Sequence, residues 1–541
     1  MRRLYALLAL LLAVPPLAAQ GACSATPENQ TGSGGTGQTG GGGEGAAGSG
    51  GFGPGSGGGP SEEEPKTCEQ AAEIRSYIGC DFWPTVVGNC VWSVFDYAVV
   101  VANAGDEPAE FTVTRAGQEV AKETVPPNQL RTVYLPWVPE LKGDDMDVNT
   151  VPVPMTASVR VEDGAYHLVS SRPVTVYQFN ALEYAPQGGP PGKDWSSCPS
   201  SSSCYSYSND ASLLLPSTAF TGNYRITGYP GWSIESIPPY IAVTATQDNT
   251  TVNVKLSAQA AVSAGDGVNS AGAGGLVTLT LQAGEVAELV GTGASDFSGS
   301  LVQADKPVQV ISGMQCVNIP EDQPACDHIE ESVFPAETLG RHYVVTVPTG
   351  PSNDGSGGHL VRLYGNVDGT SLTYPGGGPS NVPASIDAGQ VVDLGIVTED
   401  FEIVGDHEFG VASFQLGATI VDPQGQRGDP AHSLVTAVEQ YRKKYVFLAP
   451  ADYDVNYLDV VMPMDATVTL DGAPLGVTPT ELSSGFGVAR VQLGPGNGGA
   501  HLLESSAPVG IQVLGYGSFT SYQYPGGLNL ETIAPPPEDA E

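Results

Sequence analysis

Apolar and polar residues alternate with a period of two over most of the chain beyond residue 67. The segment "YIAVTATQDNTTVNVKL" alternates Val and Ile with polar residues, turns at Asp248-Asn249, and alternates again. This pattern on both sides of an Asn-containing turn predicts a β-hairpin. Comparable pairs begin elsewhere in the chain, at Tyr97, His359 and Asn456. Helical patterns are scarce, with one short turn expected at 68–75 and another at 435–440, so the chain is predicted to be all-β.

The same order of strands returns four times. Each first pair is followed by a strand introduced by a turn and then by a second apolar pair, as in "SLVQADKPVQVISGM". Three of the four copies close with a connection to a final strand that is led by Asp210, Asp327 or Asp429. Repetition on this scale predicts related β units that stack on one another. The four units are placed at about 67–230, 231–348, 349–450 and 451–532.

The two ends of the repeat region are predicted to meet. The fourth unit ends at "SYQYPGGLNL" without a closing strand, whereas "SYIGCDFWPTVV" ahead of the first unit resembles one. A ring that takes its last strand from its beginning leaves no sheet edges exposed at a seam. We therefore expect a compact pseudo-symmetric or propeller-like ring; tandem β-sandwiches are the competing architecture.

The first 66 residues have a different composition. Arg2 and Arg3 precede an apolar run and small residues, the layout of a secretory signal peptide over 1–22. Cys23 follows Gly21 and Ala22 and is the candidate for lipidation, although Gln20 stands where a lipoprotein signal has an aliphatic residue. Ordinary cleavage and free secretion are the alternative. Residues 23–66 are rich in Gly and Ser and predict a flexible tether, with a span of roughly 35–40 Å for about 45 residues.

Charge narrows the possible partners. The formal net charge is -38, and an acidic Pro-rich tail occupies 533–541. Such a body repels nucleic acid and anionic lipid, so we expect no nucleic-acid partner and a membrane association only through a lipid anchor.

The cysteines indicate an oxidising compartment. Six of the eight form close pairs along the chain, Cys68 with Cys80, Cys198 with Cys204, and Cys316 with Cys326. Short local disulfides are the natural interpretation. With Cys23 set aside for lipid, Cys90 is expected to be unpaired.

Catalytic and metal-binding motifs are weak or missing. The sequence has no G-x-S-x-G, H-E-x-x-H or P-loop pattern, so no catalytic residue, no enzyme activity and no resident metal or cofactor are expected. The carboxylates of Asp452 and Asp454 are a candidate for irregular calcium binding, against a plain polar connection. Glu330 and Glu331, adjacent on the chain, are expected in a solvated acidic loop.

Aromatic residues offer the remaining candidates for binding. Trp83, Trp92 and Trp137 are expected in the core. Trp195 and Trp232 lie in Gly- and Pro-rich loops and are candidate surface contacts, because Trp gives a large contact area at low entropic cost.

Several longer motifs resemble a known family. "SYIGCDFWPTV", "VWSVFDYAVVVAN", "TVYLPWVPELKG", "SRPVTVYQFN", "NDASLLLP" and "YPGGLNL" are similar to the N-terminal domain of the IgGFc-binding protein family, in its bacterial branch. The resemblance runs from about Cys68 to Leu530 and carries no residue-level binding map. It implies an extracellular, β-rich binding or adhesion module without known catalysis.

These observations predict an exported binding or adhesion protein that recognises a protein or a glycan. We expect it at the outer membrane or cell surface as a lipoprotein, or alternatively secreted. A self-associating envelope or matrix component and a polysaccharide-active surface enzyme are the other hypotheses.

Overall fold

The computed structural model describes residues 64–199, 204–351, 357–496 and 499–538. The expected signal peptide, Cys23 and nearly all of the expected tether lie outside these residues. The part of the chain from Pro60 onward forms one compact body.

This body is almost entirely β, as predicted, and its strands fall into four units with the same order. The first unit comprises β1 (Gly79–Phe82), β2 (Tyr97–Asn103), β3 (Ala109–Arg115), β4 (Gln118–Val125), β5 (Gln129–Leu135), β7 (His167–Phe179) and β8 (Ala211–Leu214). The second comprises β9 (Asn223–Arg225), β10 (Pro239–Ala245), β11 (Thr250–Lys255), β12 (Leu276–Leu281), β13 (Val286–Val290), β14 (Leu301–Ala304), β15 (Val308–Val317) and β16 (Asp327–Ser332). Strand β6 (Val159–Val161) leaves the first unit and pairs with β13 in the second.

The third and fourth units repeat this order. The third comprises β17 (His342–Val345), β18 (His359–Gly365), β19 (Thr370–Thr373), β20 (Ser385–Ile386), β21 (Val391–Val397), β22 (Phe401–Gly405), β23 (Phe409–Phe414) and β24 (His432–Leu434). The fourth comprises β25 (Arg442–Leu448), β26 (Val455–Pro463), β27 (Val468–Leu470), β28 (Ala473–Pro474), β29 (Thr480–Glu481), β30 (Phe486–Gln492), β31 (Ala500–Gly517) and β32 (Thr520–Pro525).

Each unit has two hydrogen-bonded layers. The inner layers have the strand orders β8-β7-β2-β5, β16-β15-β10-β13, β24-β23-β18-β21 and β32-β31-β26-β30. The outer layers have the orders β1-β7-β3-β4, β9-β14-β11-β12, β17-β22-β19-β20 and β25-β31-β27-β28. The long strands β7 and β31 run through both layers of their units, where the other two units use two separate strands.

The hairpins expected at Tyr97, Tyr240, His359 and Asn456 do not form. In the second unit β10 pairs with β13 and β15, whereas β11 pairs with β12 and β14, so the turn at Asp248-Asn249 carries the chain from one layer to the other. The turn residue Asn249 has a φ of 55°, which reverses the chain as predicted. Turn chemistry specifies a reversal of direction, but it does not specify which strands then hydrogen-bond.

Burial explains the two kinds of strand pattern. The central inner strands β2, β10 and β18 are buried along their whole length, because one face packs on the outer layer and the other on a neighbouring unit. The outer strands β11 and β12 bury every second residue, which gives the clean alternation seen in the sequence.

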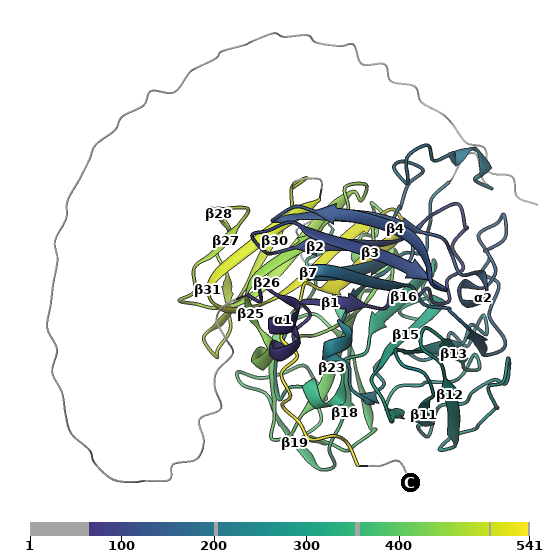
Figure 1. Ribbon diagram of the computed structural model, residues 1–541. Helices are drawn as coiled ribbons and strands as arrows, with labels where there is room; N and C mark the ends of the chain where they lie inside the picture. Colours follow the sequence, from purple (N-terminus) through teal and green to yellow (C-terminus); the bar gives the residue numbers. More distant parts are fainter. Residues whose placement is uncertain (1–63, 200–203, 352–356, 497–498, 539–541) are drawn as a thin grey trace, which may run out of the picture. The chain divides into compact units, whose positions relative to one another are not determined.

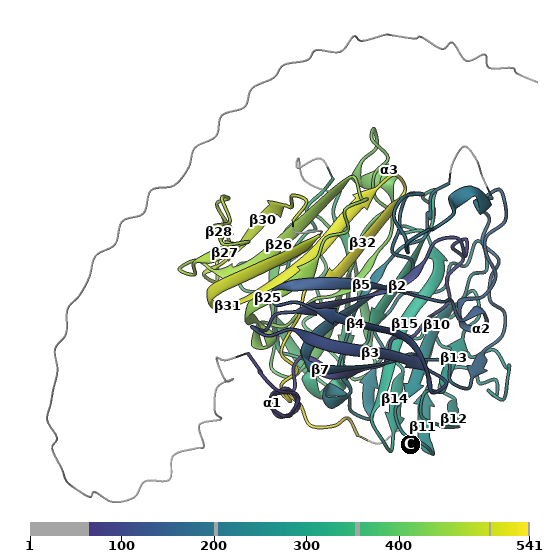
Figure 2. The ribbon, with the colours of Figure 1, turned by 45° about the horizontal axis from the view of Figure 1, so that its top comes forward.

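The four units close into a four-bladed, propeller-like ring, as predicted. The last inner strands contact one another in a cycle, β8 with β16, β16 with β24, β24 with β32, and β32 with β8. Figures 1 and 2 both show the first unit, with β2 and β3, beside the fourth, with β25 and β31.

The two ends of the repeat region seal this ring. Strand β1 pairs with β7 in the place that β9, β17 and β25 take in the later units. Just before it, Tyr77 N donates to Leu528 O at 3.1 Å, and Leu530 N donates to Arg75 O at 3.0 Å. The predicted meeting of the two ends is therefore present.

Helices are short. They are α1 (Cys68–Ile74), α2 (Pro139–Lys142), α3 (Ala418–Val421) and the 3-10 turns η1 (Trp195–Ser197), η2 (Ser217–Ala219), η3 (Ala336–Thr338) and η4 (Val438–Gln440). In the described part of the chain no helix is both long and apolar enough to cross a membrane. Disulfides join the three local pairs that the sequence favoured, Cys68–Cys80, Cys198–Cys204 and Cys316–Cys326, and Cys90 is a buried free thiol.

Candidate functional site

The strands that meet at the centre of the ring carry polar side chains. Asp210, immediately before β8, accepts hydrogen bonds on one carboxylate oxygen from the backbone N–H of Glu330 at 3.1 Å and of His432 at 2.9 Å. Its other oxygen accepts from the N–H of Ala211 at 2.9 Å and of Gln523 at 3.4 Å. These donors lie on strands of all four units, so one carboxylate connects the whole ring.

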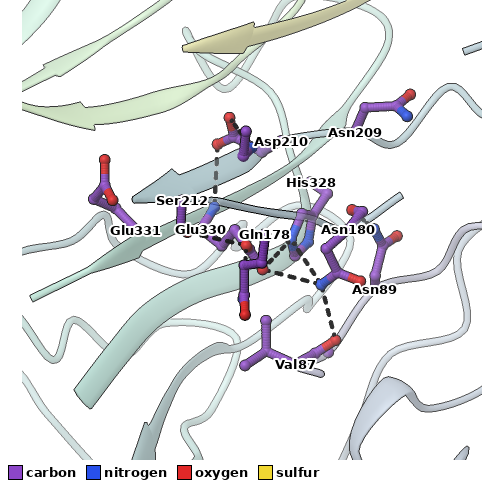
Figure 3. A network of polar contacts seen from close by, with 12 residues as sticks. Val87, Asn89, Gln178, Asn180, Asn209, Asp210, Ser212, His328, Glu330 and Glu331 are labelled. Carbon is purple, nitrogen blue, oxygen red and sulfur yellow. Dashed lines mark hydrogen bonds and ion pairs between the residues drawn. The ribbon is translucent and has the colours of Figure 1, made fainter. Parts of the chain in front are cut away.

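A second carboxylate organises the first and second units. Glu330 Oε1 accepts from Gln178 Nε2 and from Ser212 Oγ, each at 3.0 Å. Its Oε2 accepts from Asn180 Nδ2 at 3.0 Å and lies 3.3 Å from His328 Nε2. Figure 3 shows these side chains turned toward one another between neighbouring strands. Glu330 and Glu331 are fully buried, so the expectation of a solvated acidic loop is wrong.

The Asp residues that lead the closing strands are not equivalent. In the first unit Tyr177 of β7 pairs with Leu213 of β8, and at the corresponding position of the second unit Ile311 of β15 pairs with Ser332 of β16. Counting back along the chain from Ser332 to Asp327, and by the same number of residues from Leu213, leads to Ser208. The counterpart of Asp327 in the first unit is therefore Ser208, two residues ahead of Asp210. Asp327 and Asp429 are both buried, and burial together with the Asp327 charge raises the pKa of Asp429 well above its usual range.

The polar side chains of this centre, among them Asp210, Glu330 and His432, are buried. Burial lowers the pKa of His432 to about 3, so the imidazole of His432 stays neutral. Within the described ranges no group of three His, Cys, Asp or Glu side chains is placed to hold a metal ion. We conclude that this network fixes the register of the four units relative to one another.

An open groove lies between the third and fourth units. Its volume is about 660 Å³, which is in the range of pockets that hold small ligands or short peptide segments. It is lined by the connector after β17, the turn after β21, the loop between β28 and β29, and the edge of β30, with residues Val347, Pro348, Thr349, Gly350, Thr398, Glu399, Asp400, Val477, Arg490 and Gln492.

Charged side chains are held in place around this groove. Arg490 Nη2 lies 2.6 Å from Asp400 Oδ1 and donates to Val347 O at 3.1 Å. Beneath them, Asp459 accepts from the N–H of Thr349 at 2.9 Å and from its hydroxyl at 2.5 Å. Burial raises the pKa of Asp459 to about 6, against the opposing effect of Arg490. Glu399, in contrast, is exposed and makes no ion pair with any described residue.

The groove is open because the connection in the third unit is short. At the junction of the first two units, the chain between β5 and β7 extends over the neighbouring unit and adds β6 to the edge of β13. Between β21 and β22 only the turn 398–400 is present, so among the described residues this connection adds no strand to β30 as β6 is added to β13.

The residues singled out in the sequence occupy other places. Trp195 is half-buried, with its ring centroid 5.2 Å from that of Phe95, and Lys193 Nζ lies 5.0 Å from the Trp195 centroid. Trp232 is half-buried in a bridge with Ile237. Trp83 and Trp92 are in the core, as expected.

The two residues of the candidate calcium pair differ in their surroundings. Asp452 is partly buried and accepts from the backbone N–H of Tyr184 at 2.7 Å, whereas Asp454 is exposed. The groove residues, for their part, were missed by the sequence analysis. Thr349, Asp400 and Arg490 are far apart along the chain and belong to no motif, so only the packing of the third unit on the fourth brings them together.

The fold and the groove define a disulfide-bonded, all-β ring domain with an open site between two of its units. The family model described as "IgGFc binding protein" matches residues 210–515, more than half of the chain. The chain therefore belongs to the IgGFc-binding protein family.

The chain is similar to a part of one human protein. The human protein "IgGFc-binding protein" is 25% identical over 330 residues, covering 60% of this chain but 6% of the human protein. The chain thus spans a small fraction of the curated relative it matches. A crystal structure titled "Putative membrane anchored protein" from Corynebacterium diphtheriae is 8% identical with a TM-score of 0.10, covering 82% of this chain and all of that one, and it carries no argument about the fold.

Proposed function

We propose that this protein is an exported binding protein whose ring recognises another extracellular protein. The observation that carries the proposal is the family match over 210–515 to proteins named for binding the Fc part of immunoglobulin G. The three disulfides and the open groove between the third and fourth units support it, since a rigid scaffold with an exposed site is suited to recognition.

We further propose that acylation at Cys23 holds the protein on a cell surface, with residues 23–66 as the tether and no catalytic activity. Several acyl chains would provide stable anchoring, because a single chain binds only reversibly. Intact mass of the mature N-terminus tests this. Diacyl or triacyl mass on Cys23 is the expected result, and an unmodified N-terminus means free secretion.

Binding is tested with purified full-length protein on immobilised immunoglobulin Fc, with and without its glycan, and on a panel of other extracellular proteins. Saturable binding to a native protein, lost when that protein is denatured, is expected. Binding that depends on the glycan alone would transfer the assignment to a carbohydrate ligand. The absence of binding to every protein tested would count against the proposal.

A further inference from the structure

We propose that the groove between the third and fourth units binds an extended segment of the partner polypeptide, which adds as a strand to the edge of β30 and presents a basic side chain to Glu399. This inference rests on the proposed function, because it names the chemistry of the partner that a protein-binding ring would take.

The molecule contains its own precedent for this mode of binding. At the junction of the first two units, β6 adds antiparallel to β13, with Val159 opposite Glu288 and Val161 opposite Val286. Glu288 pairs with Ala242 on β10, as Arg490 pairs with Asp459 on β26, and these are corresponding positions of the two units. The edge at Arg490 is therefore the counterpart of an edge that an extended Val-Arg-Val segment already occupies.

The edge of β30 is only partly used within its own unit. Strand β29 pairs with Gly487 and Val488, and its ladder ends there. Pro479, immediately before β29, has no N–H to donate to a continued ladder. No residue of β29 therefore pairs with Arg490 in the way that Val159 of β6 pairs with Glu288.

Backbone direction shows that Arg490 presents its peptide groups to this edge. Leu482 N donates to Phe486 O at 2.7 Å on the β29 side, and Leu493 N donates to Asn456 O at 2.9 Å on the β26 side. Because successive strand residues point alternately to the two sides, Arg490 has the orientation of Phe486, away from β26. An added strand would find the backbone N–H of Arg490 as a hydrogen-bond donor and its C=O as an acceptor.

Charge favours a basic segment. In the precedent, the guanidinium of Arg160 binds Glu285 Oε1 through Nε at 2.9 Å and through Nη2 at 2.6 Å. In the groove, Asp400 is already paired with Arg490, whereas Glu399 is exposed and has no ion-pair partner among the described residues. The net charge of -38 adds long-range attraction for a cationic partner.

Apolar lining completes the site. Val477 is 40% exposed, and it lines the groove together with Val347 and Pro348. Such a surface suits the β-branched residues that alternate with the basic one in β6.

The test uses full-length protein and a capped peptide with the sequence of residues 156–162, TASVRVE, measured by isothermal titration or fluorescence anisotropy. Saturable binding is expected, and replacing the peptide's Arg by Gln should weaken it about two- to fivefold, as for an exposed ion pair. E399Q should have the same effect, and the two changes together should cost no more than one alone. V477W should fill the groove and abolish binding, whereas E119Q on the distant strand β4 should change nothing.

The outcomes separate this inference from the proposed function. Equal binding by V477W, or by a scrambled peptide, overturns strand addition in the groove. If a glycan binds saturably, this binding is lost in V477W and the peptide does not bind, then the groove holds a carbohydrate and not a polypeptide. If V477W captures an extracellular protein as well as the parent does, the groove is not the binding site, whereas the proposed function stands. Thermal unfolding of V477W verifies that the variant folds.

Discussion

Replacing Asp210 by Asn should destabilise the whole ring, because this carboxylate accepts backbone N–H groups from strands of all four units. Each oxygen receives two donors, from Glu330 and His432 on one side and from Ala211 and Gln523 on the other. Asn keeps one acceptor and turns an NH₂ toward the other pair, so two buried N–H groups lose their partner. At about 1–3 kcal/mol for each unsatisfied group, the loss is about 2–6 kcal/mol.

The effect is measurable as a shift in the thermal midpoint. A body of about 480 residues has an unfolding entropy of roughly 1 kcal/mol/K, so the midpoint should fall by about 2–6 °C. Differential scanning fluorimetry measures it, with exposed Asp465 replaced by Asn as the matched control, which should stay within about 0.5 kcal/mol of the parent. A D210N protein with an unchanged midpoint would refute the view that this carboxylate holds the units together.

Three further results are expected. Burial raises the pKa of Glu183 and of Glu288 to about 8, so the folded state keeps these protons where the unfolded state, with the ordinary value of 4.5, has lost them. The free energy of unfolding should then fall between about pH 4.5 and 8, by up to about 1.4 kcal/mol per pH unit for each group. His359 and His432, whose pKa is lowered to about 3, oppose this trend below their ordinary value of 6.5. Thermal midpoints at pH 6.5 and 8.5 test the prediction, and E288Q should flatten the dependence. Burial raises the pKa of Cys90 to about 11, so iodoacetamide should label it only after denaturation, and labelling of the native protein would contradict the closed core. Arg442 binds Glu64 at 2.6 Å and Asn529 at 2.6 Å where the two ends meet. R442M should cost about 3 kcal/mol and increase hydrogen exchange of β1 first, whereas uniform exchange would argue against a seam at this point.

The sequence alone determined the class of fold and its repetition. Alternation with a period of two, turn residues such as Asn249 and the recurring strand order are local properties, and each is set by the chemistry of a few neighbouring residues. The short spacings of Cys68 with Cys80 and of Cys316 with Cys326 likewise limited the choice of disulfide partners. The resemblance of the first strand to a closing strand carried enough information to predict that the ends meet.

Only the tertiary structure decided which strands hydrogen-bond and where polar groups converge. The strands on either side of Asp248-Asn249 separate into different layers because a fully apolar strand is best buried between the outer layer and a neighbouring unit. Glu330 is buried, against expectation, because donors from distant strands satisfy both of its carboxylate oxygens, and Glu331 is buried beside it with one oxygen accepting from the N–H of the adjacent Ser332. The groove at Arg490 exists because the turn 398–400 is too short to cover the adjoining unit. Such contacts depend on how whole units pack together, and no local pattern in the chain records that.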